Sequence, residues 1–172
     1  NLNIDKLPKI IAVSKTFKID KILPLIEHGH IHFGENKVQE AESKWSEIKN
    51  EYKNIQLHMV GSLQSNKAKK AVKLFDYIHS LDSDRLALKI SQSEKELGKK
   101  TKLFIQVNMG GEEQKSGIKL NLLDDFAFEG KSFDFIFIDA KKTEYKKYID
   151  KIVDKQLIDQ RSIICVDNVF MK

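Results

Sequence analysis

Short apolar runs alternate with longer segments whose apolar residues recur every three or four positions, along the whole chain. The apolar runs predict β-strands at residues 10–14, 31–33, 56–60, 77–80, 102–108, 133–138 and 162–167. The periodic segments predict helices at about residues 19–28, 36–51, 65–75, 83–97, 121–129 and 143–157. This alternation is typical of the α/β class, in which helices connect parallel strands through right-handed crossovers.

Several predicted strands are apolar over their whole length, namely Ile10 to Val13, Phe133 to Ile138 and Ile163 to Val166. Such runs are typical of parallel sheets that are covered on both faces. In the first predicted helix, Pro24 is expected within about the first turn, where its missing N–H matters least. Gly29 is expected to close the same helix.

The pattern contains seven strands, whereas a closed (β/α)8 barrel requires eight, usually in about 250 residues. The expected fold is therefore an open or strained barrel-like sheet, or two sub-structures packed together. An open edge of a parallel sheet exposes unpaired backbone groups. We therefore expect self-association through that edge.

The composition is that of a globular protein, with 41% hydrophobic and 32% charged residues among 172. No apolar run approaches the roughly 20 residues that cross a bilayer, which argues against a membrane protein. The single cysteine, Cys165, excludes an internal disulfide and agrees with a reducing compartment. The expected location is the cytoplasm.

The net charge of +5 is partly local, because four lysines fall within seven residues of one predicted helix: Lys67, Lys69, Lys70 and Lys73. One interpretation is a phosphate or nucleic-acid patch. The other is a solvated helix face with its apolar side at Ala68, Ala71, Val72 and Phe75. No aromatic residue interleaves with the lysines, so the solvated face is favoured and nucleic acid is not an expected partner.

Polar residues follow the predicted strands, and the first of them is Lys15. A lysine among strand ends can lose its charge by desolvation, and the neutral amine can form a Schiff base with an aldehyde. On pattern alone, a solvated lysine is the commoner case. In barrels and in open α/β sheets, functional sites lie at the C-terminal strand ends. Polar residues there are expected to share one edge of the sheet.

Five motifs after Lys15 extend this picture. In order, they are His32 to Glu40, Leu57 to Lys67, Ile78 to Asp82, Val107-Asn108 and Glu113 to Gly117. Together they resemble the pyridoxal phosphate homeostasis proteins, which are single-domain barrels similar to the N-terminal domain of alanine racemase. The resemblance runs from about residue 9 to 125. It implies that Lys15 carries the cofactor as a Schiff base and that Asn36 lies beside it.

The same resemblance aligns His58 and His79 with family positions, as cofactor contacts or as hydrogen-bonded histidines within strands. Family members bind and buffer the cofactor without a firmly assigned turnover, so enzymatic activity stays open. In the family, the last strands hold the phosphate with a helix N-terminus and glycines. Those strands are absent here, which predicts weakened binding.

A second group of motifs begins near Ser132, with Phe133 to Lys142 and Ile163 to Val169. It resembles the metal-dependent O-methyltransferases that use S-adenosylmethionine, over about residues 132–170. The resemblance implies Asp139, Asp167 and Asn168 as ligands of Mg²⁺ or Ca²⁺ and Lys142 as the catalytic general base. Pattern alone allows Asp139 as a helix N-cap and the other two as a turn.

This second resemblance is incomplete. The family sequence Asp-Ala-Asp-Lys is Asp139-Ala140-Lys141-Lys142 here, so a basic residue replaces an acidic one. The glycine-rich loop and the acidic ribose-binding residue that hold S-adenosylmethionine belong upstream, where this chain resembles the other family. We therefore expect neither S-adenosylmethionine binding nor methyl transfer.

The sequence thus predicts an incomplete (β/α) barrel-like parallel sheet of about five β/α units, joined to a Rossmann-like βαβ unit. The expected domains are residues 1–125, a partial pyridoxal-phosphate-binding barrel, and residues 126–172, a partial methyltransferase segment. The expected function is binding of pyridoxal 5'-phosphate, weakened by truncation. The alternatives are a metal-dependent methyltransferase remnant and a joined fragment without activity.

Overall fold

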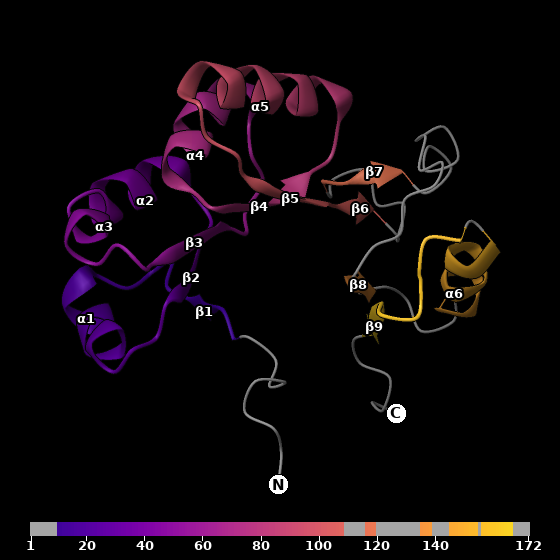
Figure 1. Cartoon of the computed structure of the whole chain (residues 1–172), viewed down its shortest axis with the longest axis horizontal. Helices are drawn as coiled ribbons and strands as arrows, with labels where there is room; N and C mark the ends of the chain where they lie inside the picture. The colour runs from indigo at the N-terminus through magenta and orange to yellow at the C-terminus, as the bar shows by residue number, and fades with distance from the viewer. Residues whose placement is uncertain (1–9, 109–115, 120–134, 139–144, 155, 167–172) are drawn as a thin grey trace, which may run out of the picture. The chain divides into compact units, whose positions relative to one another are not determined.

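The computed structural model describes residues 10–108, 116–119, 135–138, 145–154 and 156–166. The chain forms two compact units, unit 1 (Asn1–Gln106) and unit 2 (Val107–Lys172). Figure 1 shows their elements. The predicted boundary at residues 125 and 126 lies outside the described residues, and so does the predicted helix 121–129.

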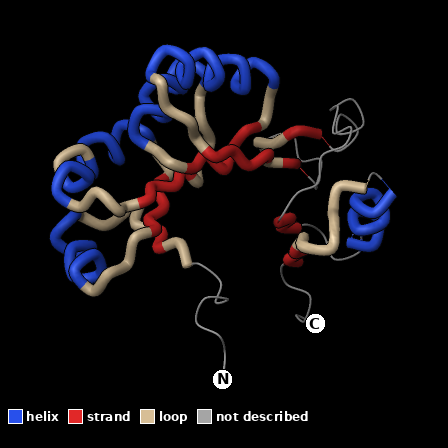
Figure 2. Tube along the Cα trace, in the orientation of Figure 1, coloured by secondary structure: helices blue, strands red, loops and turns tan. Residues whose placement is uncertain are grey.

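Unit 1 contains one five-stranded parallel sheet with the order β1-β2-β3-β4-β5. Its strands are β1 (Ala12–Val13), β2 (His32–Glu35), β3 (Gln56–Met59), β4 (Tyr77–Leu81) and β5 (Lys102–Ile105). The connecting helices are α1 (Ile19–Glu27), α2 (Val38–Trp45), α3 (Ile48–Glu51), the 3₁₀-helix η2 (Ser65–Lys67), α4 (Ala68–Leu74) and α5 (Asp84–Leu97). Each strand pairs with the next in sequence, and the helices lie along one side of the sheet (Figure 2). This arrangement is barrel-like, as predicted.

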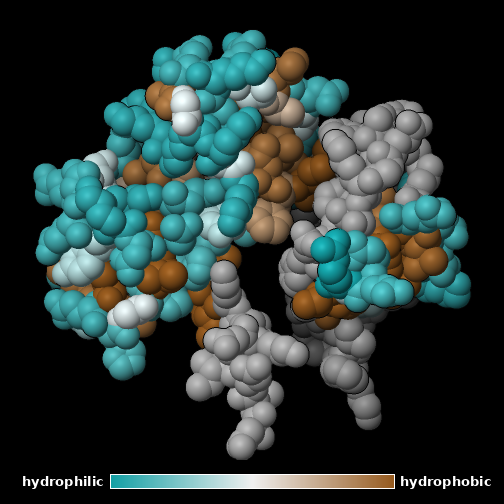
Figure 3. Space-filling view, viewed as in Figure 1, coloured by the Kyte–Doolittle hydropathy of each residue, from teal (hydrophilic) through white to brown (hydrophobic). Residues whose placement is uncertain are grey.

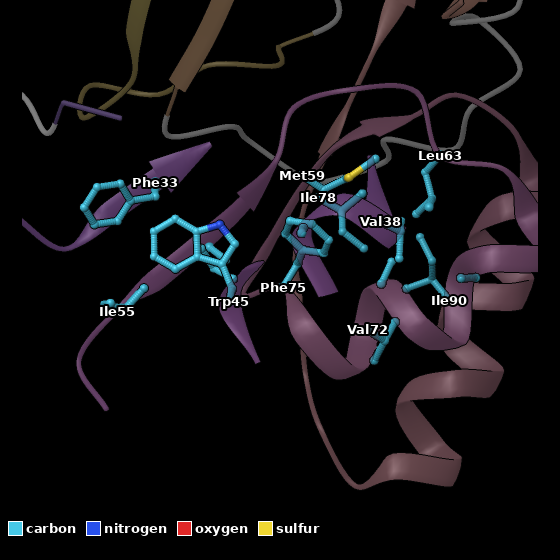
Figure 4. Close-up of a cluster of buried hydrophobic side chains, with 14 of the residues drawn as sticks. Phe33, Val38, Trp45, Ile55, Met59, Leu63, Val72, Phe75, Ile78 and Ile90 are labelled. Atoms are coloured by element: carbon cyan, nitrogen blue, oxygen red, sulfur yellow. The ribbon is translucent and has the colours of Figure 1, made fainter. Parts of the chain in front are cut away.

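The core of unit 1 lies between the sheet and these helices (Figure 4). Trp45 of α2, Phe33 of β2 and Phe75 after α4 are fully buried there. Figure 3 shows hydrophilic residues over the outer surface of the helices, as their period of three and four predicts. The outward residues of the strands thus pack under the helices, which leaves the alternate residues on the inner face of the sheet.

Local signals set the ends of two helices. The hydroxyl of Ser83 accepts a hydrogen bond from the Leu86 N–H and caps α5. Gly29 has φ +95°, and the His30 N–H donates to the Leu25 carbonyl at 3.1 Å, which closes α1 in a Schellman motif. The prediction that Gly29 closes this helix is confirmed.

The described residues of unit 2 form two strand pairs, both parallel. The strands β6 (Val107–Asn108) and β7 (Ile118–Lys119) form one pair. The strands β8 (Phe135–Ile138) and β9 (Ile163–Val166) form the other, and α6 (Tyr145–Asp154) lies between them in sequence. Ile138, Tyr148, Ile152 and Leu157 form its buried core. The last two long strands of the sequence pattern are thus neighbours in a parallel pair.

Three expectations about burial and helix position were wrong. Ile10 and Val13 are 72% and 49% exposed, because β1 is the edge strand and pairs only with β2 among the described strands. In β9, Ile163 is 61% exposed, so the two-stranded sheet is not covered on both faces there. Pro24 lies inside α1, beyond its first turn, where it removes one helical hydrogen bond.

Three element boundaries also differ from the pattern. The predicted helix 36–51 is two helices, α2 and α3. The predicted strand 102–108 divides at Gln106, whose N–H still bonds the Leu81 carbonyl at 2.8 Å. The two-residue strand β7 was not predicted, because two residues carry no periodicity.

The lysines of α4 lie on a solvated helix face, which is the interpretation that the sequence favoured. Ala68 and Ala71 are buried beneath it. On its outer side, Lys69 pairs with Glu96 at 2.7 Å and Lys70 pairs with Glu42 at 2.8 Å. Within the described ranges, no helix has the length and apolar character needed to cross a membrane.

Candidate functional site at the strand ends of unit 1

Lys15 lies at the C-terminal edge of the sheet, in a tight turn that follows β1. The Ser14 N–H still donates to the Gly34 carbonyl of β2 at 2.9 Å, and the Phe17 N–H then donates to the Ser14 carbonyl at 3.0 Å. The chain therefore leaves the sheet at Lys15, as predicted. The residue is exposed, which is the commoner case for a lysine after a strand. Only a ligand that covers Lys15 would desolvate it.

A buried charged network holds this turn from below. Glu35 of β2 is fully buried, and its Oε1 accepts hydrogen bonds from the Ser14 hydroxyl at 2.8 Å and from Trp45 Nε1 at 3.0 Å. Lys44 of α2 donates to the same Oε1 at 2.8 Å and to the Ser14 carbonyl at 2.9 Å. The residue before Lys15 is therefore fixed by its side chain and by its backbone. This network therefore restricts the position of the Lys15 backbone, from which its side chain extends.

Asn36 follows β2 directly and is half-buried. Its backbone runs against Gly61, the second residue after β3. A Cβ atom on Gly61 would collide with the Asn36 carbonyl group, so only glycine fits there. The two loops that leave β2 and β3 are thus in direct backbone contact. Asn36 is fixed at the edge of the sheet by this contact.

An open depression lies beside this edge, between the turn that follows β1 and the segment of α2 and α3. Its lining residues are Lys15, Thr16, Phe17, Lys18, Ile19, Glu40, Ser43, Lys44, Glu47 and Ile48. Asn36 is not among the lining residues. A common cleft for Lys15 and Asn36 therefore stays a prediction.

Three histidines form a hydrogen-bonded chain across neighbouring strands of unit 1. His32 Nδ1 lies 3.0 Å from His58 Nε2, and His58 Nδ1 lies 3.0 Å from His79 Nε2. Aromatic rings hold two of the imidazoles, since Tyr77 stacks on His58 at 4.2 Å and Phe104 stacks on His79 at 4.4 Å between ring centroids. Both ring nitrogens of His58 are occupied by other histidines. His58 and His79 lie inside the strands β3 and β4, which is one of the two positions that the sequence left open.

Burial lowers the pKa of His58 to about 3, and the neighbouring His79 and His32 lower it further in the same direction, while Asp76 opposes them. Burial also lowers the pKa of His79. Among the described residues, the amine of Lys102 in β5 also lies near the stack, 4.9 Å from the centre of the Tyr77 ring. His58 and His79 are therefore neutral at neutral pH.

This neutrality predicts acid sensitivity. In the unfolded chain, His58 binds a proton below about pH 6.5, whereas in the folded chain it does so only near pH 3. Stability is therefore unaffected above pH 7 and falls as the pH drops from 6.5 towards 3. We expect a loss of about 2 kcal/mol by pH 4, after discounting for solvent screening.

Urea unfolding at a series of pH values, followed by the fluorescence of Trp45, measures this loss in unit 1. The variant His58→Gln retains a group that donates and accepts hydrogen bonds but does not titrate in this range. Its stability should depend less on pH. Equal acid sensitivity of the two proteins would contradict the assignment to His58.

The remaining predicted site residues, Asp139, Lys142, Asp167 and Asn168, lie outside the described residues. The paired strands that precede them end at Ile138 and Val166, which are register partners. Within the described residues, no group of three or more acidic, histidine or cysteine side chains is arranged to hold a metal ion. The proposed metal ligands therefore stay a prediction.

Sequence reasoning missed the roles of Glu35, Lys44 and His32. Glu35 ends a strand whose residues are all buried, so its carboxylate needed a nearby cation, and this was a usable signal. Lys44 gave no local sign, because it reaches Glu35 from another element. His32 is two residues from Gly34, so both lie on the same face of β2. Because Gly34 is the register partner of His58, this is the inner face that also carries His58.

The fold and the strand-end residues define the class: an α/β protein with a parallel, barrel-like sheet. Solved structures share this fold. PipY of Synechococcus elongatus PCC7942 without pyridoxal phosphate is 29% identical with a TM-score of 0.70, and it covers 92% of this chain and 81% of its own. The structure of PipY with pyridoxal phosphate bound is 26% identical with a TM-score of 0.67. This match covers 97% of this chain and 95% of the PipY chain. Alanine racemase of Clostridium difficile 630, at 14% identity and a TM-score of 0.57, covers 92% of this chain and 45% of its own, and supports the fold alone.

Curated relatives match the first part of the chain. A pyridoxal phosphate homeostasis protein of Vibrio alginolyticus is 36% identical over 112 residues, which are 64% of this chain and 48% of that protein. The protein of the same name from Escherichia coli strain K12 is 34% identical over 119 residues, 69% of this chain and 51% of its own length. The chain thus spans about half the length of these relatives.

The O-methyltransferase family model matches residues 67–172. This match covers more than half of the chain, and by it the chain belongs to the O-methyltransferase family. The matched segment begins well upstream of Ser132 and includes β4 and β5, which lie in the same sheet as β1, β2 and β3. Similarity to two families within one chain agrees with the expected chimera.

Proposed function

We propose that the chain binds pyridoxal 5'-phosphate, as a cofactor-holding protein of the homeostasis type, with Lys15 as the residue that forms a Schiff base with it. The observation that carries this proposal is the exposed lysine at a strand end whose preceding residue is fixed by the buried Glu35 and Lys44. The similarity to PipY and to the homeostasis proteins supports the same choice of ligand.

The neighbouring residues suit such a ligand. Lys15 supplies an accessible amine, and Asn36 supplies an amide that donates and accepts hydrogen bonds. Close backbone contact at Gly61 holds Asn36 in place. His79 has one ring nitrogen, Nδ1, without a hydrogen-bond partner among the described residues, and we assign it to the ligand's surroundings. His58 contributes through His79, because both of its own nitrogens are occupied.

Titration with pyridoxal phosphate tests the proposal. We expect the absorbance band of a lysine Schiff base to appear and saturate at one cofactor per chain. Retention should be weaker than in a full-length homeostasis protein, because each missing donor to the phosphate removes about 1–3 kcal/mol, or roughly tenfold in affinity per 1.4 kcal/mol.

Dialysis after loading separates the outcomes. Loss of the band within the first buffer changes fits a weakened site, with the Escherichia coli relative as the retaining control. Near-stoichiometric retention would contradict the expected weakness and would require a substitute phosphate site. No band at saturating cofactor would contradict the function itself.

A second candidate function follows from the family match over residues 67–172, namely a metal-dependent O-methyltransferase remnant. Its site would comprise Asp139, Asp167 and Asn168 as ligands of Mg²⁺ or Ca²⁺, with Lys142 as the base. Residues 126–172 would then be a Rossmann-like βαβ segment joined to the barrel-like residues 1–125. We also propose a cytoplasmic protein that associates with itself through the exposed edge strand β1.

Calorimetry with S-adenosylmethionine and Mg²⁺ decides whether this second site works. We expect weak Mg²⁺ binding, because Ca²⁺ or Mg²⁺ needs about six or more oxygen ligands and water must supply several of them. We expect no heat from S-adenosylmethionine. Clear binding of S-adenosylmethionine would make unit 2 an enzyme site rather than a remnant.

A further inference from the structure

The histidine chain of unit 1 has a geometry that single hydrogen-bonded histidines do not have. Each hydrogen bond joins an Nδ1 atom to the Nε2 atom of the next ring, from His32 to His58 and from His58 to His79. A neutral imidazole carries its proton on one nitrogen and accepts on the other. The three rings therefore satisfy both bonds only when all carry the proton on Nδ1 or all carry it on Nε2.

These two arrangements interconvert by transfer of one proton along the chain. A proton that enters at His32 Nε2 moves one on from His32 Nδ1 to His58 Nε2 and another from His58 Nδ1 to His79 Nε2, and a proton leaves from His79 Nδ1. One proton enters and one leaves. The chain is neutral before and after, so no charge remains on an inner face where His32 and His58 are 9% and 4% exposed.

The chain also climbs along the sheet. His32 is the first residue of β2, while His58 is the register partner of Gly34, two residues further. His79 follows the pair Met59 and Ile78 by one residue, which places it level with Val60. The Val60 N–H bonds the Glu35 carbonyl, so this level is at the end of β2, beside Asn36. Along the strand direction, the Cα positions of His32 and His79 thus differ by four residues, roughly 13 Å, while successive ring centroids are 5.2 Å apart.

We propose that His32, His58 and His79 form a proton relay along the inner face of the five-stranded sheet, which exchanges a proton with the ligand held at the strand ends. The second half of this proposal rests on the proposed function. A lysine ammonium must lose one proton before its nitrogen can bond to carbon, so a ligand that condenses with Lys15 creates the need for such an exchange.

Two features of the site fit a relay better than a metal centre. The imidazole nitrogens point at one another in series rather than at a common point, and no metal-binding group of side chains occurs in the described ranges. Stacking by Tyr77 and Phe104 fixes the ring planes that the hydrogen bonds require. The serial hydrogen bonds and the aromatic stacking together keep the three rings aligned.

Nitrogen-15 NMR of the full chain, labelled in the histidine rings, tests the relay without any ligand. The signals of each ring report which nitrogen carries the proton. In the wild-type chain, the three rings should show the same tautomer, and the first proton that the chain takes up in acid should shift the signals of all three rings with one midpoint, because that proton is shared among them. Three independent titration curves or mixed tautomers would overturn the relay.

Two variants extend the test. His79→Phe keeps a ring to stack on Phe104 but removes the last acceptor, so the tautomer of His32 should change although His58 lies between the two residues in the hydrogen-bonded chain. In a His58→Phe background, the same replacement should leave His32 unchanged. An unaltered His32 signal in the single variant would overturn the relay. The wild-type titration decides the question even if a variant fails to fold.

Addition of pyridoxal phosphate tests the connection to the ligand. If the Schiff-base band appears, the His32 ring signals should shift in the wild-type chain and not in His58→Phe. A band without any change at His32 would overturn the link to the ligand. If no band appears, the proposed function fails, and the ligand-free coupling still establishes or overturns the relay by itself.

Discussion

Replacement of Lys15 by alanine is expected to abolish the Schiff-base band of pyridoxal phosphate, because the amine of Lys15 follows β1 directly, next to Ser14, which Glu35 and Lys44 hold in place. The absorbance of the loaded variant, compared with the wild-type chain at the same cofactor concentration, measures the effect. Residual noncovalent binding through the phosphate would remain, without the band.

The matched control is Lys21→Ala, which removes an exposed lysine from α1 six residues further along. It leaves the turn after β1 intact, so the band should keep its full amplitude. Retention of the band by Lys15→Ala would contradict the assignment of the reactive amine. Equal loss in both variants would point to general reaction with surface lysines.

The second large effect is expected from Lys44→Met, which leaves the fully buried Glu35 carboxylate without its cation. Breaking a buried pair from one side costs about 3–5 kcal/mol, and the Lys44–Glu35 pair has side chains 12% and 0% exposed. The chain should therefore lose about that much stability in urea. The turn that carries Lys15 should also loosen, because Lys44 bonds the Ser14 carbonyl.

The chain offers a close control in Lys37→Met. Lys37 pairs with Glu40 at 2.7 Å, but these side chains are 63% and 48% exposed. An exposed pair of this kind contributes less than about 1 kcal/mol. Similar losses in the two variants would show that the Glu35 network is not buried in solution. The double variant Lys44→Met with Glu35→Gln should recover part of the loss, since no charge then remains buried.

The sequence could predict the elements of unit 1 because each has a local cause. The apolar periodicity located α5, and Ser83 and Gly98 mark its two ends. The burial of a strand depends on its place in the sheet, which the local sequence does not show. For this reason β1 was expected to be buried, although it lies at the edge. The break between α2 and α3 has no glycine or proline to mark it.

The candidate site divides in the same way. Lys15 and Asn36 were predictable, since both follow strands and strand ends share one edge of a parallel sheet. The contact of Lys44 with Glu35 and the chain from His32 to His79 join side chains from different elements. Their existence depends on strand register, which a single sequence does not state. Residue type and strand phase suggested the partners but not the bonds.

Borohydride reduction of the loaded wild-type chain, followed by digestion and mass spectrometry, tests the central claim most directly. Reduction converts a lysine Schiff base into a stable bond, so the labelled peptide identifies the amine that held the cofactor. The account predicts one dominant label, on Lys15. A label spread over exposed lysines such as Lys21 and Lys37, or no label at all, would contradict it.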